Sequence, residues 1–417
     1  MTEVKLSRLM AMAVVLATLL TLIGAYPAEA AFPGANGNIA FEREGNIWLT
    51  GPSGLGTPID TLLTDLTPNT ATSQEVDPAM SPNGRKVAFA SDRDGDFEIF
   101  TLDIYTGALT KITRNTVRDA QPAWSPDGRR IAFESPNPMA GDEDIFSANA
   151  DGTGAIVNEV NRTGDQRTPS WSPDGSEIAF VDARFADIAV ETLATHAYRQ
   201  VTTNGIGVQD LLPDWSPDGT RIVFQSDRAV PDRDFEIFTV RSSDGSEIRQ
   251  LTNNGHDDGN AAYSPDGLRI VYVDFGFGSD QMFTRDSSTG SNAMLIGGFP
   301  TNETAPDWGD AVPPPAGCGI GGTFFADTIN ANNGTNTICS LSGDDGVNAR
   351  GGSDTLKGGP GRDTLIGSDG RDQLLGGEGR DLLDSRDGVN GNDSLDGGAG
   401  RDRCVKDTRE ASIMSCP

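Results

Sequence analysis

Short segments in which apolar and polar residues alternate recur along the first three quarters of the chain. RIAFES (130–135) and FEIFTL (97–102) are typical, and alternation with a period of two is the pattern of a half-buried β-strand. Turn-forming phrases such as Ser-Pro-Asp-Gly separate these segments, because proline presets φ at the second position of a tight turn and glycine tolerates the fourth. The pattern predicts antiparallel sheets of short strands and an all-β fold.

One phrase returns about every 45 residues. It reads AMSPNG from residue 79, AWSPDG from 123, SWSPDG from 170, DWSPDG from 214, AYSPDG from 262 and a truncated DWGD from 307. Each repeat has room for a four-stranded sheet, which is too small to bury its own faces, so the sheets are expected to stack around an axis as a β-propeller. We expect the recurring aromatic residues to wedge between blades as core, with sugar stacking as the lesser alternative: Trp124, Trp171, Trp215, Tyr263 and Trp308.

The two ends of this region complete each other. Residues 36–50 (NGNIAFE, then GNIWLT) match the later strands but lack a preceding aromatic strand, whereas the strand around Trp308 has no continuation. We therefore expect the strand at Trp308 to pair with strands between residues 38 and 69, which closes a ring of six blades. The propeller is predicted to span residues 31–312.

The repeat PxWSPDGxxIAFxSxRDGxxEIF resembles that of the TolB-like (PD40, WD40-like) propeller family over roughly residues 32–310. This resemblance implies a six-bladed propeller whose funnel face meets another protein. We take the architecture from it and leave the partner open.

Charge and composition narrow the function. Asp plus Glu number 61 against 32 Lys plus Arg, a net charge of −29, which excludes polyanionic partners such as nucleic acid and favours divalent cations. Only His196 and His256 could supply imidazole, and GxSxG, HExxH and P-loop motifs are absent from the sequence. We therefore predict no enzyme. The alternative is a propeller enzyme that acts on acidic polysaccharide with a metal in the funnel.

The amino-terminal segment has the pattern of an export signal. Lys5 and Arg8 precede an apolar run over 9–25, and Ala28-Glu29-Ala30 provides small residues at a cleavage site, so residues 1–30 are predicted to be a signal peptide and the protein to be secreted, with no membrane span after cleavage. Cysteines oxidise outside the cell. Of three possible pairings, loop closure favours Cys318 with Cys339 and Cys404 with Cys416.

After a Pro-rich linker (313–317), a nine-residue period GGxGxDxUx begins at residue 351. It resembles the RTX (hemolysin-type) calcium-binding repeat, which implies a short parallel β-roll over 318–417 that binds Ca²⁺. A leucine in phase after each aspartate argues against a disordered linker. The candidate ligands are aspartates for their hard anionic oxygens and glycines for their exposed carbonyls: Asp354, Asp363, Asp372, Asp381, Asp393, Asp402, Gly352, Gly359, Gly361, Gly370, Gly377 and Gly379.

Two nine-residue turns make one coil, so equivalent positions recur every eighteen residues. This spacing pairs Asp354 with Asp372 and Asp363 with Asp381, which are the strongest candidates. A three-residue insertion before Asp393 leaves the register of the last two aspartates open. The arginines that precede four aspartates could repel an ion or point to solvent: Arg362, Arg371, Arg380 and Arg401.

Residues 324–346 are expected to form a degenerate first turn, and 404–416 a disulfide-capped end. The sequence as a whole predicts an exported, non-catalytic protein whose tail folds on calcium and whose propeller binds a protein or a glycan.

Overall fold

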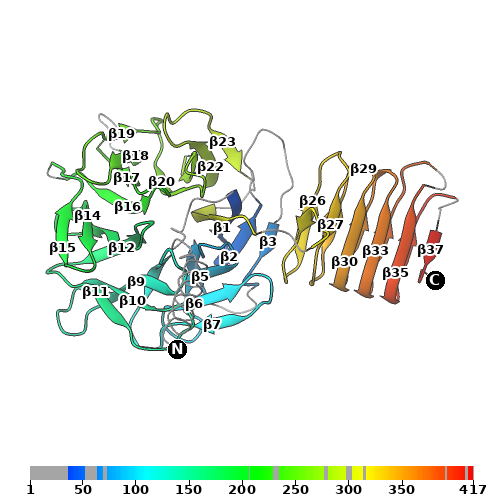
Figure 1. Ribbon diagram of the computed structural model, residues 1–417, viewed down its shortest axis with the longest axis horizontal. Helices are drawn as coiled ribbons and strands as arrows, with labels where there is room; N and C mark the ends of the chain where they lie inside the picture. The colour runs from blue at the N-terminus through cyan, green and yellow to red at the C-terminus, as the bar shows by residue number, and fades with distance from the viewer. Residues whose placement is uncertain are drawn as a thin grey trace, which may run out of the picture.

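The computed structural model describes residues 36–51, 63–68, 73–205, 207–228, 234–276, 280–296, 303–312, 316–389, 392–408 and 412–416. Every regular element in these ranges is a β-strand, so the predicted all-β class is confirmed. The strands form a ring with a stack of parallel strands extending from one side (Figure 1). The predicted signal peptide and the three prolines 313–315 lie outside the described residues.

Five blades of the ring are four-stranded antiparallel sheets that follow one another along the chain. Blade II contains β4 (Glu75–Met80), β5 (Lys86–Ser91), β6 (Glu98–Asp103) and β7 (Leu109–Lys111). Blade III contains β8 (Ala120–Trp124), β9 (Arg130–Pro136), β10 (Glu143–Asn149) and β11 (Val157–Val160). Blade IV contains β12 (Gln166–Trp171), β13 (Glu177–Asp182), β14 (Asp187–Thr192) and β15 (Ala197–Gln200). Blade V contains β16 (Asp210–Trp215), β17 (Arg221–Ser226), β18 (Glu236–Arg241) and β19 (Arg249–Gln250). Blade VI contains β20 (Asp258–Tyr263), β21 (Arg269–Asp274), β22 (Gln281–Asp286) and β23 (Met294–Ile296).

Blade I closes the ring from both ends of the repeat region, as predicted. It combines β24 (Glu303–Asp310) with β1 (Asn36–Arg43), β2 (Asn46–Thr50) and β3 (Leu63–Asp65). Trp308 of β24 lies opposite Ile39 of β1 in an antiparallel pair. The indole N–H of Trp308 also donates to the carbonyl of Gly37, at 3.0 Å.

The recurring aromatic residues lie between blades. Trp124 packs in one cluster with Ala88 of blade II and Ile131 of blade III, and its indole N–H donates to the carbonyl of Ala79 in blade II. The other four occupy the same place at the next four blade contacts, Trp308 between blades VI and I. All five are at most 6% exposed. Each blade therefore buries its face against its neighbour, because a four-stranded sheet cannot do so alone.

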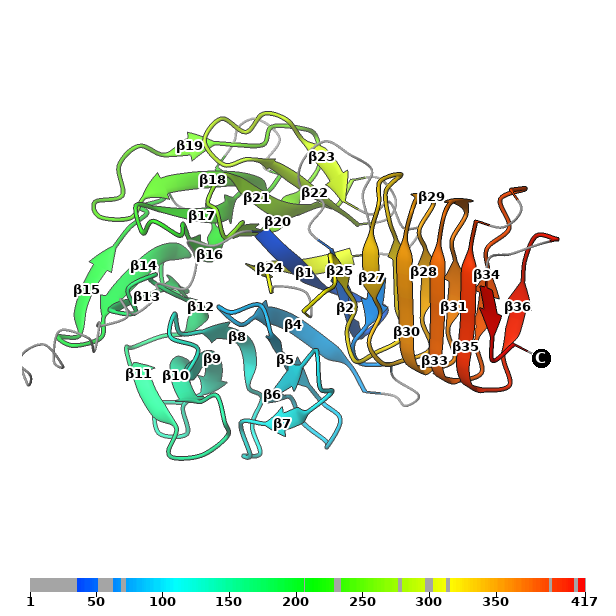
Figure 2. The same cartoon turned by 45° about the vertical axis from the view of Figure 1, so that its right-hand side comes forward.

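The stack beside the ring is a roll of flattened coils, in which each coil has two short strands and two turns (Figure 2). One parallel sheet contains β25 (Ile320–Gly321), β27 (Thr337–Cys339), β30 (Thr355–Gly361), β33 (Gln373–Gly379), β35 (Ser394–Gly400) and β37 (Ser412–Met414). The other contains β26 (Asp327–Asn330), β28 (Gly346–Asn348), β31 (Thr364–Ile366), β34 (Leu382–Asp384) and β36 (Arg403–Val405), and a short pair joins β29 (Gly351–Gly352) to β32 (Asp369–Gly370).

Leucines fill the inside of the roll, one from each half-coil. Leu356 lies opposite Leu374 in adjacent parallel strands, and Leu374 lies opposite Leu395. These residues, with Leu365 and Leu383, have no exposed surface. The leucines that recur in phase with the aspartates, and that argued against a disordered tail, thus form the core of the roll.

Ring and roll are continuous. The outer strand of blade I, β3, pairs antiparallel with β26 of the first coil, so that one nine-stranded sheet runs from β24 through the roll to β36. The apolar core is shared as well, because Leu49 and Leu102 of blades I and II belong to the same buried cluster as Ile329 and Leu356 of the roll. The sequence, which places a Pro-rich linker at this junction, did not predict this connection.

Candidate metal centre and axial pocket

The turns of the roll place one aspartate of each half-coil above its equivalent in the next coil. The backbone N–H of Asp363 donates to Oδ1 of Asp381 at 2.9 Å, and that of Asp354 donates to Oδ1 of Asp372 at 2.9 Å. The two predicted pairs therefore lie together, and the same bond repeats along both edges of the roll. One column contains Asp327, Asp345, Asp363, Asp381 and Asp402, and the other contains Asn336, Asp354, Asp372 and Asp393.

The second carboxylate oxygen of these aspartates is buried and has no hydrogen-bond partner within the described part of the protein. This holds for Oδ2 of six residues that are at most 5% exposed: Asp345, Asp354, Asp363, Asp372, Asp381 and Asp402. A buried anionic oxygen without a partner is costly, by several kcal/mol in a dry environment. The columns thus favour either a cation at the turns or a proton on the carboxyl groups.

Glycine carbonyls line the same turns. The predicted glycines all have φ between +107° and +153°, a region that favours glycine. A Cβ on Gly361 would lie 1.7 Å from the carbonyl oxygen of Gly343 in the preceding coil, and one on Gly379 would lie 1.5 Å from that of Gly361. Gly352, Gly359, Gly370 and Gly377 face carbonyls in the same way. Each turn therefore presents backbone oxygens to the next without side chains between them.

The insertion before Asp393 does not break the columns. Strand β35 pairs with β33 at an offset of 21 residues instead of 18, and the N–H groups of Asp372 and Asp381 still reach Oδ1 of Asp393 and Asp402, at 2.8 and 3.0 Å. The last two aspartates are in register, because the extra residues extend the turn that follows Asp384 and leave both strands in place. The structure thus resolves the register that the sequence left open.

The four arginines that precede aspartates are exposed, at the outer rim of the turns. Arg362 uses its backbone N–H to bond Oδ1 of Asp344, while its side chain is directed to solvent. Of the two possibilities left open by the sequence, the structure shows the outward one. Their charge does not take the place of a cation inside the columns.

Burial raises the pKa of these carboxyls. Desolvation is the largest cause, and it raises the pKa of Asp363 and Asp372 to about 6 and that of Asp345 to about 8, although a backbone N–H partly opposes it. Neighbouring carboxylates in the same column add to the rise for Asp363 and Asp372. A cation at the turns would reverse both effects.

The donor set fits calcium. Hard carboxylate and carbonyl oxygens are the ligands that Ca²⁺ takes, six to eight at a time. Among the described residues, no group of three or more His, Cys, Asp or Glu side chains could hold a metal ion. A site in this roll would therefore combine carboxylates of stacked turns with several backbone carbonyls.

Sequence reasoning missed part of the columns. Asp345 lies eighteen residues before Asp363 and belongs to the same column, and counting back by the coil length would have found it. The first glycine of each turn was missed too. Oδ2 of Asp363 and Asp381 lies 2.2 and 2.5 Å from where a Cβ on Gly358 and Gly376 would be, so those positions accept no side chain.

The disulfides lie at the two ends of the roll. Cys318 is bonded to Cys339 and Cys404 to Cys416, with Cα separations of 6.0 and 5.8 Å. These are the two pairings that loop closure favoured. The second bridge ties β36 to the segment of β37, which adds a further strand to the roll.

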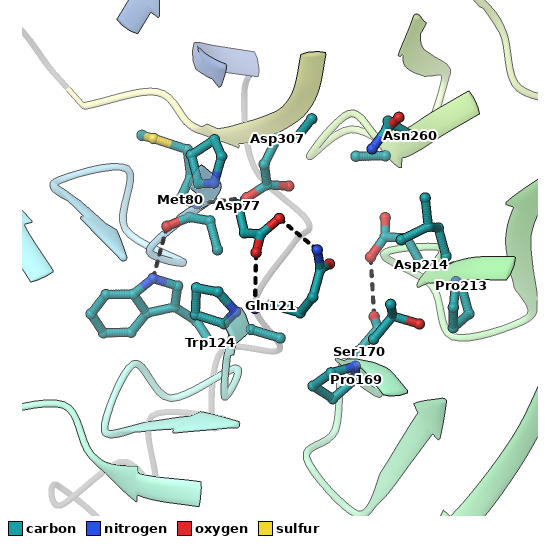
Figure 3. A pocket seen from close by; sticks show the side chains of 18 of the residues that line it. Asp77, Met80, Gln121, Trp124, Pro169, Ser170, Pro213, Asp214, Asn260 and Asp307 are labelled. Carbon is teal, nitrogen blue, oxygen red and sulfur yellow. Dashed lines mark hydrogen bonds between the residues drawn. The ribbon is translucent and has the colours of Figure 1, made fainter. Parts of the chain in front are cut away.

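A second candidate site is the cavity on the propeller axis, of about 150 Å³ (Figure 3). Each of the six inner strands contributes a β-bulge residue with φ between +47° and +56°, which re-aims the backbone at the axis. These residues are Asp77, Gln121, Thr168, Leu212, Asn260 and Ala305.

Three carboxyls face this cavity. Asp77 accepts hydrogen bonds from the side chain and backbone of Gln121, Asp214 accepts from Ser170 Oγ and the N–H of Tyr263, and Asp307 accepts from the N–H of Met80. Desolvation raises the pKa of Asp77 and Asp214 to about 7 and that of Asp307 to about 6. The cavity can therefore take up protons, or a cationic group, near neutral pH.

Family comparison agrees with this geometry. The model of the TolB beta propeller domain (PD40) matches residues 68–167 and 160–309, and the model of the RTX calcium-binding nonapeptide repeat matches residues 322–347, 348–383 and 387–405. The chain belongs to the TolB beta propeller domain family. This PD40 propeller carries RTX repeats on its carboxyl side, as the sequence predicted. A comparison with curated proteins found no match.

Solved structures are similar to this chain over the propeller. TolB from Acinetobacter baumannii is 18% identical with a TM-score of 0.54, and the match covers 65% of this chain and 66% of that one. Hydrazine synthase of Kuenenia stuttgartiensis is 15% identical (TM-score 0.53; 67% and 47% covered), and a chain of a nidogen/laminin complex is 12% identical (TM-score 0.51; 65% and 97%). At these identities the likeness shows the fold alone.

The two histidines of this PD40 protein do not converge. His196 lies in the turn after β14 in blade IV, where Nδ1 is 2.9 Å from Oε1 of Glu191. His256 precedes β20 of blade VI, with Nδ1 3.7 Å from Oδ1 of Asp274.

The described residues contain no helix long and apolar enough to cross a membrane.

Proposed function

We propose that this protein is an exported, non-catalytic calcium-binding protein whose roll folds on Ca²⁺ and whose propeller binds a protein or glycan partner. The observation that carries the proposal is the two columns of buried aspartates, in which six Oδ2 atoms have no hydrogen-bond partner among the residues that the structure describes. The match to RTX calcium-binding repeats over the same turns supports it.

Calcium would supply positive charge at the turns, where carboxylate and carbonyl oxygens of this chain would hold it. Asp363 and Asp381 in one column, and Asp354 and Asp372 in the other, would present Oδ2 to the ion, while the glycine turns present carbonyl oxygens. Oδ1 of each aspartate stays bonded to the backbone of the preceding coil, so every bound ion also fixes the stacking of two coils.

Export would act as the trigger in this scheme. At low cytosolic calcium, the stacked carboxylates repel one another and the roll is loose. At the millimolar calcium outside a cell, binding to the folded state alone stabilises it by RT ln(1 + [Ca²⁺]/Kd), about 2.7 kcal/mol per site when calcium is a hundredfold above Kd. The predicted signal peptide and the two disulfides support an extracellular setting.

A non-catalytic role is favoured by what the carboxyls and histidines do. The three axial carboxyls each accept hydrogen bonds from the protein, and the two histidines lie in different blades. The opposing hypothesis is a propeller enzyme for acidic polysaccharide. A panel of glycans and pectin fragments with product detection separates the two, since turnover would contradict the proposal and binding without turnover would support it.

The central experiment titrates the full chain with Ca²⁺ after EDTA treatment, by calorimetry and circular dichroism. We expect saturable binding with a gain of β signal. Asp363→Asn should lower the affinity of its site roughly tenfold or abolish it, because it removes one anionic oxygen. Asp369→Asn makes the same change at an exposed turn position and should behave as wild type. A roll that is fully ordered in EDTA, with no heat on adding calcium, would contradict the proposal.

A further inference from the structure

The coil next to the propeller differs from all later coils at the positions that would face an ion. We call it the first coil, residues 320–341, with strands β25, β26 and β27. Asp327 and Asn336 occupy the column positions in this coil. In both cases the protein itself supplies a donor, whereas Oδ2 of six later column aspartates has none among the described residues.

At Asp327, one threonine donates hydrogen bonds to both carboxylate oxygens. The hydroxyl of Thr323 donates to Oδ1 at 2.9 Å, and the backbone N–H of Thr323 donates to Oδ2 at 2.5 Å. Eighteen residues later, Leu341 stands where Thr323 stands, and Oδ2 of Asp345 is buried without a hydrogen-bond partner among the described residues.

In the other column, a neutral amide stands where the later coils have aspartate. The Nδ2 group of Asn336 lies among four oxygens. It donates to the carbonyl of Gly334 and lies 3.4 Å from the carbonyl and Oδ1 of Asn332 and from Oδ1 of Asp354. An NH₂ group carries partial positive charge on two hydrogens, so it satisfies carboxylate and carbonyl oxygens without a metal.

The first coil is also fastened to the propeller. β26 pairs with β3 of blade I, and the N–H of Phe324 donates to the carbonyl of Ile104 in blade II at 3.0 Å. The Phe324 ring fits over Gly107, where a Cβ would lie 2.5 Å from it.

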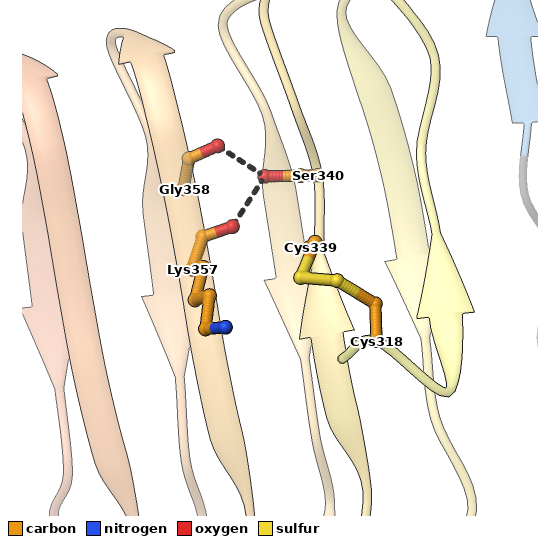
Figure 4. Close-up of a disulfide and its surroundings, with 5 residues drawn as sticks. All are labelled: Cys318, Cys339, Ser340, Lys357 and Gly358. Atoms are coloured by element: carbon orange, nitrogen blue, oxygen red, sulfur yellow. Dashed lines mark hydrogen bonds between the residues drawn. A yellow bond between two sulfur atoms is a disulfide. The ribbon is translucent and has the colours of Figure 1, made fainter. Parts of the chain in front are cut away.

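The same coil is closed covalently. The Cys318–Cys339 bridge joins the residues just before β25 to β27, the last strand of the coil. The neighbouring hydroxyl of Ser340 donates to the carbonyls of Lys357 and Gly358 in the next coil, at 3.3 and 2.9 Å (Figure 4). A disulfide restricts the conformations of the unfolded chain, so less entropy is lost when the coil folds.

We propose that the first coil is a metal-free cap that stays folded against blades I and II without calcium and templates the calcium-dependent coils from the propeller outward. This inference rests on the proposed function, since it assigns calcium to the later turns only. The direction of templating follows from where the hydrogen-bond donors lie. The protein provides them at Thr323 and Asn336 in the first coil, and calcium provides positive charge in the coils farther from the propeller.

The first test counts ions. Asn336→Asp replaces the amide with the group that Asp354 and Asp372 carry at the same column position, so we expect the full-length variant to bind one more Ca²⁺ per chain than wild type at saturation, measured by equilibrium dialysis. Asn333→Asp adds the same charge at an exposed side chain in that turn and should leave the number unchanged. An Asn336→Asp variant that folds and binds the wild-type number would overturn the inference.

The second test needs no variant. Hydrogen exchange of the full chain in EDTA should find the amides of β26 and β27 protected and those of β33 to β36 open, with calcium closing the latter by tenfold or more. Exchange of β27 as fast as that of β33 in EDTA would overturn the cap. Protection of every coil in EDTA, with no calcium bound, would instead refute the proposed function, so the two failures are distinguishable.

Discussion

Aspartate has two opposite roles in this chain, and its surroundings decide between them. In the Ser-Pro-Asp-Gly turns, Asp218 accepts bonds from the Ser216 hydroxyl and from the backbone and hydroxyl of Thr220, and these bonds outweigh desolvation and lower its pKa. Asp214, four residues earlier, faces the axial cavity, and desolvation raises its pKa to about 7. The same residue type therefore favours its charged form in one position and its neutral form in the other.

This contrast predicts a pH dependence. The native state holds a proton on Asp214 up to about pH 7, whereas the unfolded chain releases it near the usual value of 3.8, so the free energy of unfolding falls as pH rises between the two. Asp214→Asn stays neutral, and its amide can still pair with Ser170 and Tyr263. We expect the variant to lose less stability than wild type between pH 4 and pH 8, by on the order of 4 kcal/mol, in urea unfolding with EDTA present.

Asp218→Asn is the matched control. Because the pKa of Asp218 is lowered, its stabilising contribution is lost only as pH falls below the usual value, and the slope between pH 4 and pH 8 should stay that of wild type. Identical pH slopes for Asp214→Asn and wild type would show that Asp214 ionises normally in the native state.

At the scale of elements, closure of the ring depends on a single strand from the far end of the propeller. β24 supplies Trp308, which is 1% exposed and packs with Val271 of blade VI and Phe41 of blade I. Trp308→Ala should lower the free energy of unfolding by about 3–5 kcal/mol, because the large cavity it leaves cannot collapse between two sheets. Chemical unfolding of the full chain measures this loss.

Phe185→Ala is the comparison for Trp308→Ala. Phe185 lies in the turn before β14 and is 53% exposed, so its truncation should change stability by less than about 1 kcal/mol. Equal effects of the two substitutions would mean that closure at β24 contributes little to the stability of the ring.

The strands also show which parts of the fold could be predicted from the sequence alone. The strand repeat and the Ser-Pro-Asp-Gly turn predicted every blade, since both are local patterns. The offset of β35 was not predictable, because the nine-residue period has no information on where three extra residues are accommodated.

For the whole molecule, the shared sheet predicts how calcium acts at a distance. β3 belongs to the propeller and pairs with the roll, whereas β19 of blade V is the outer strand of a separate sheet. Calcium binding should therefore slow hydrogen exchange at β3, through the stack that begins at β26, and leave β19 unchanged. Equal responses at β3 and β19, or none at β3 while the roll itself closes, would contradict coupling through the sheet.

The sequence by itself determined the six-bladed ring, the coiled tail, the aspartates in phase and the candidate cysteine pairs, because each follows from periodicity, turn chemistry or short loop closure. Only the tertiary structure decided that tail and ring form one sheet, that Asp393 and Asp402 stay in register, and that Thr323 and Asn336 donate hydrogen bonds in the first coil. These features depend on which atoms of distant segments meet, and a carboxylate oxygen has a partner or lacks one only when the coils are stacked.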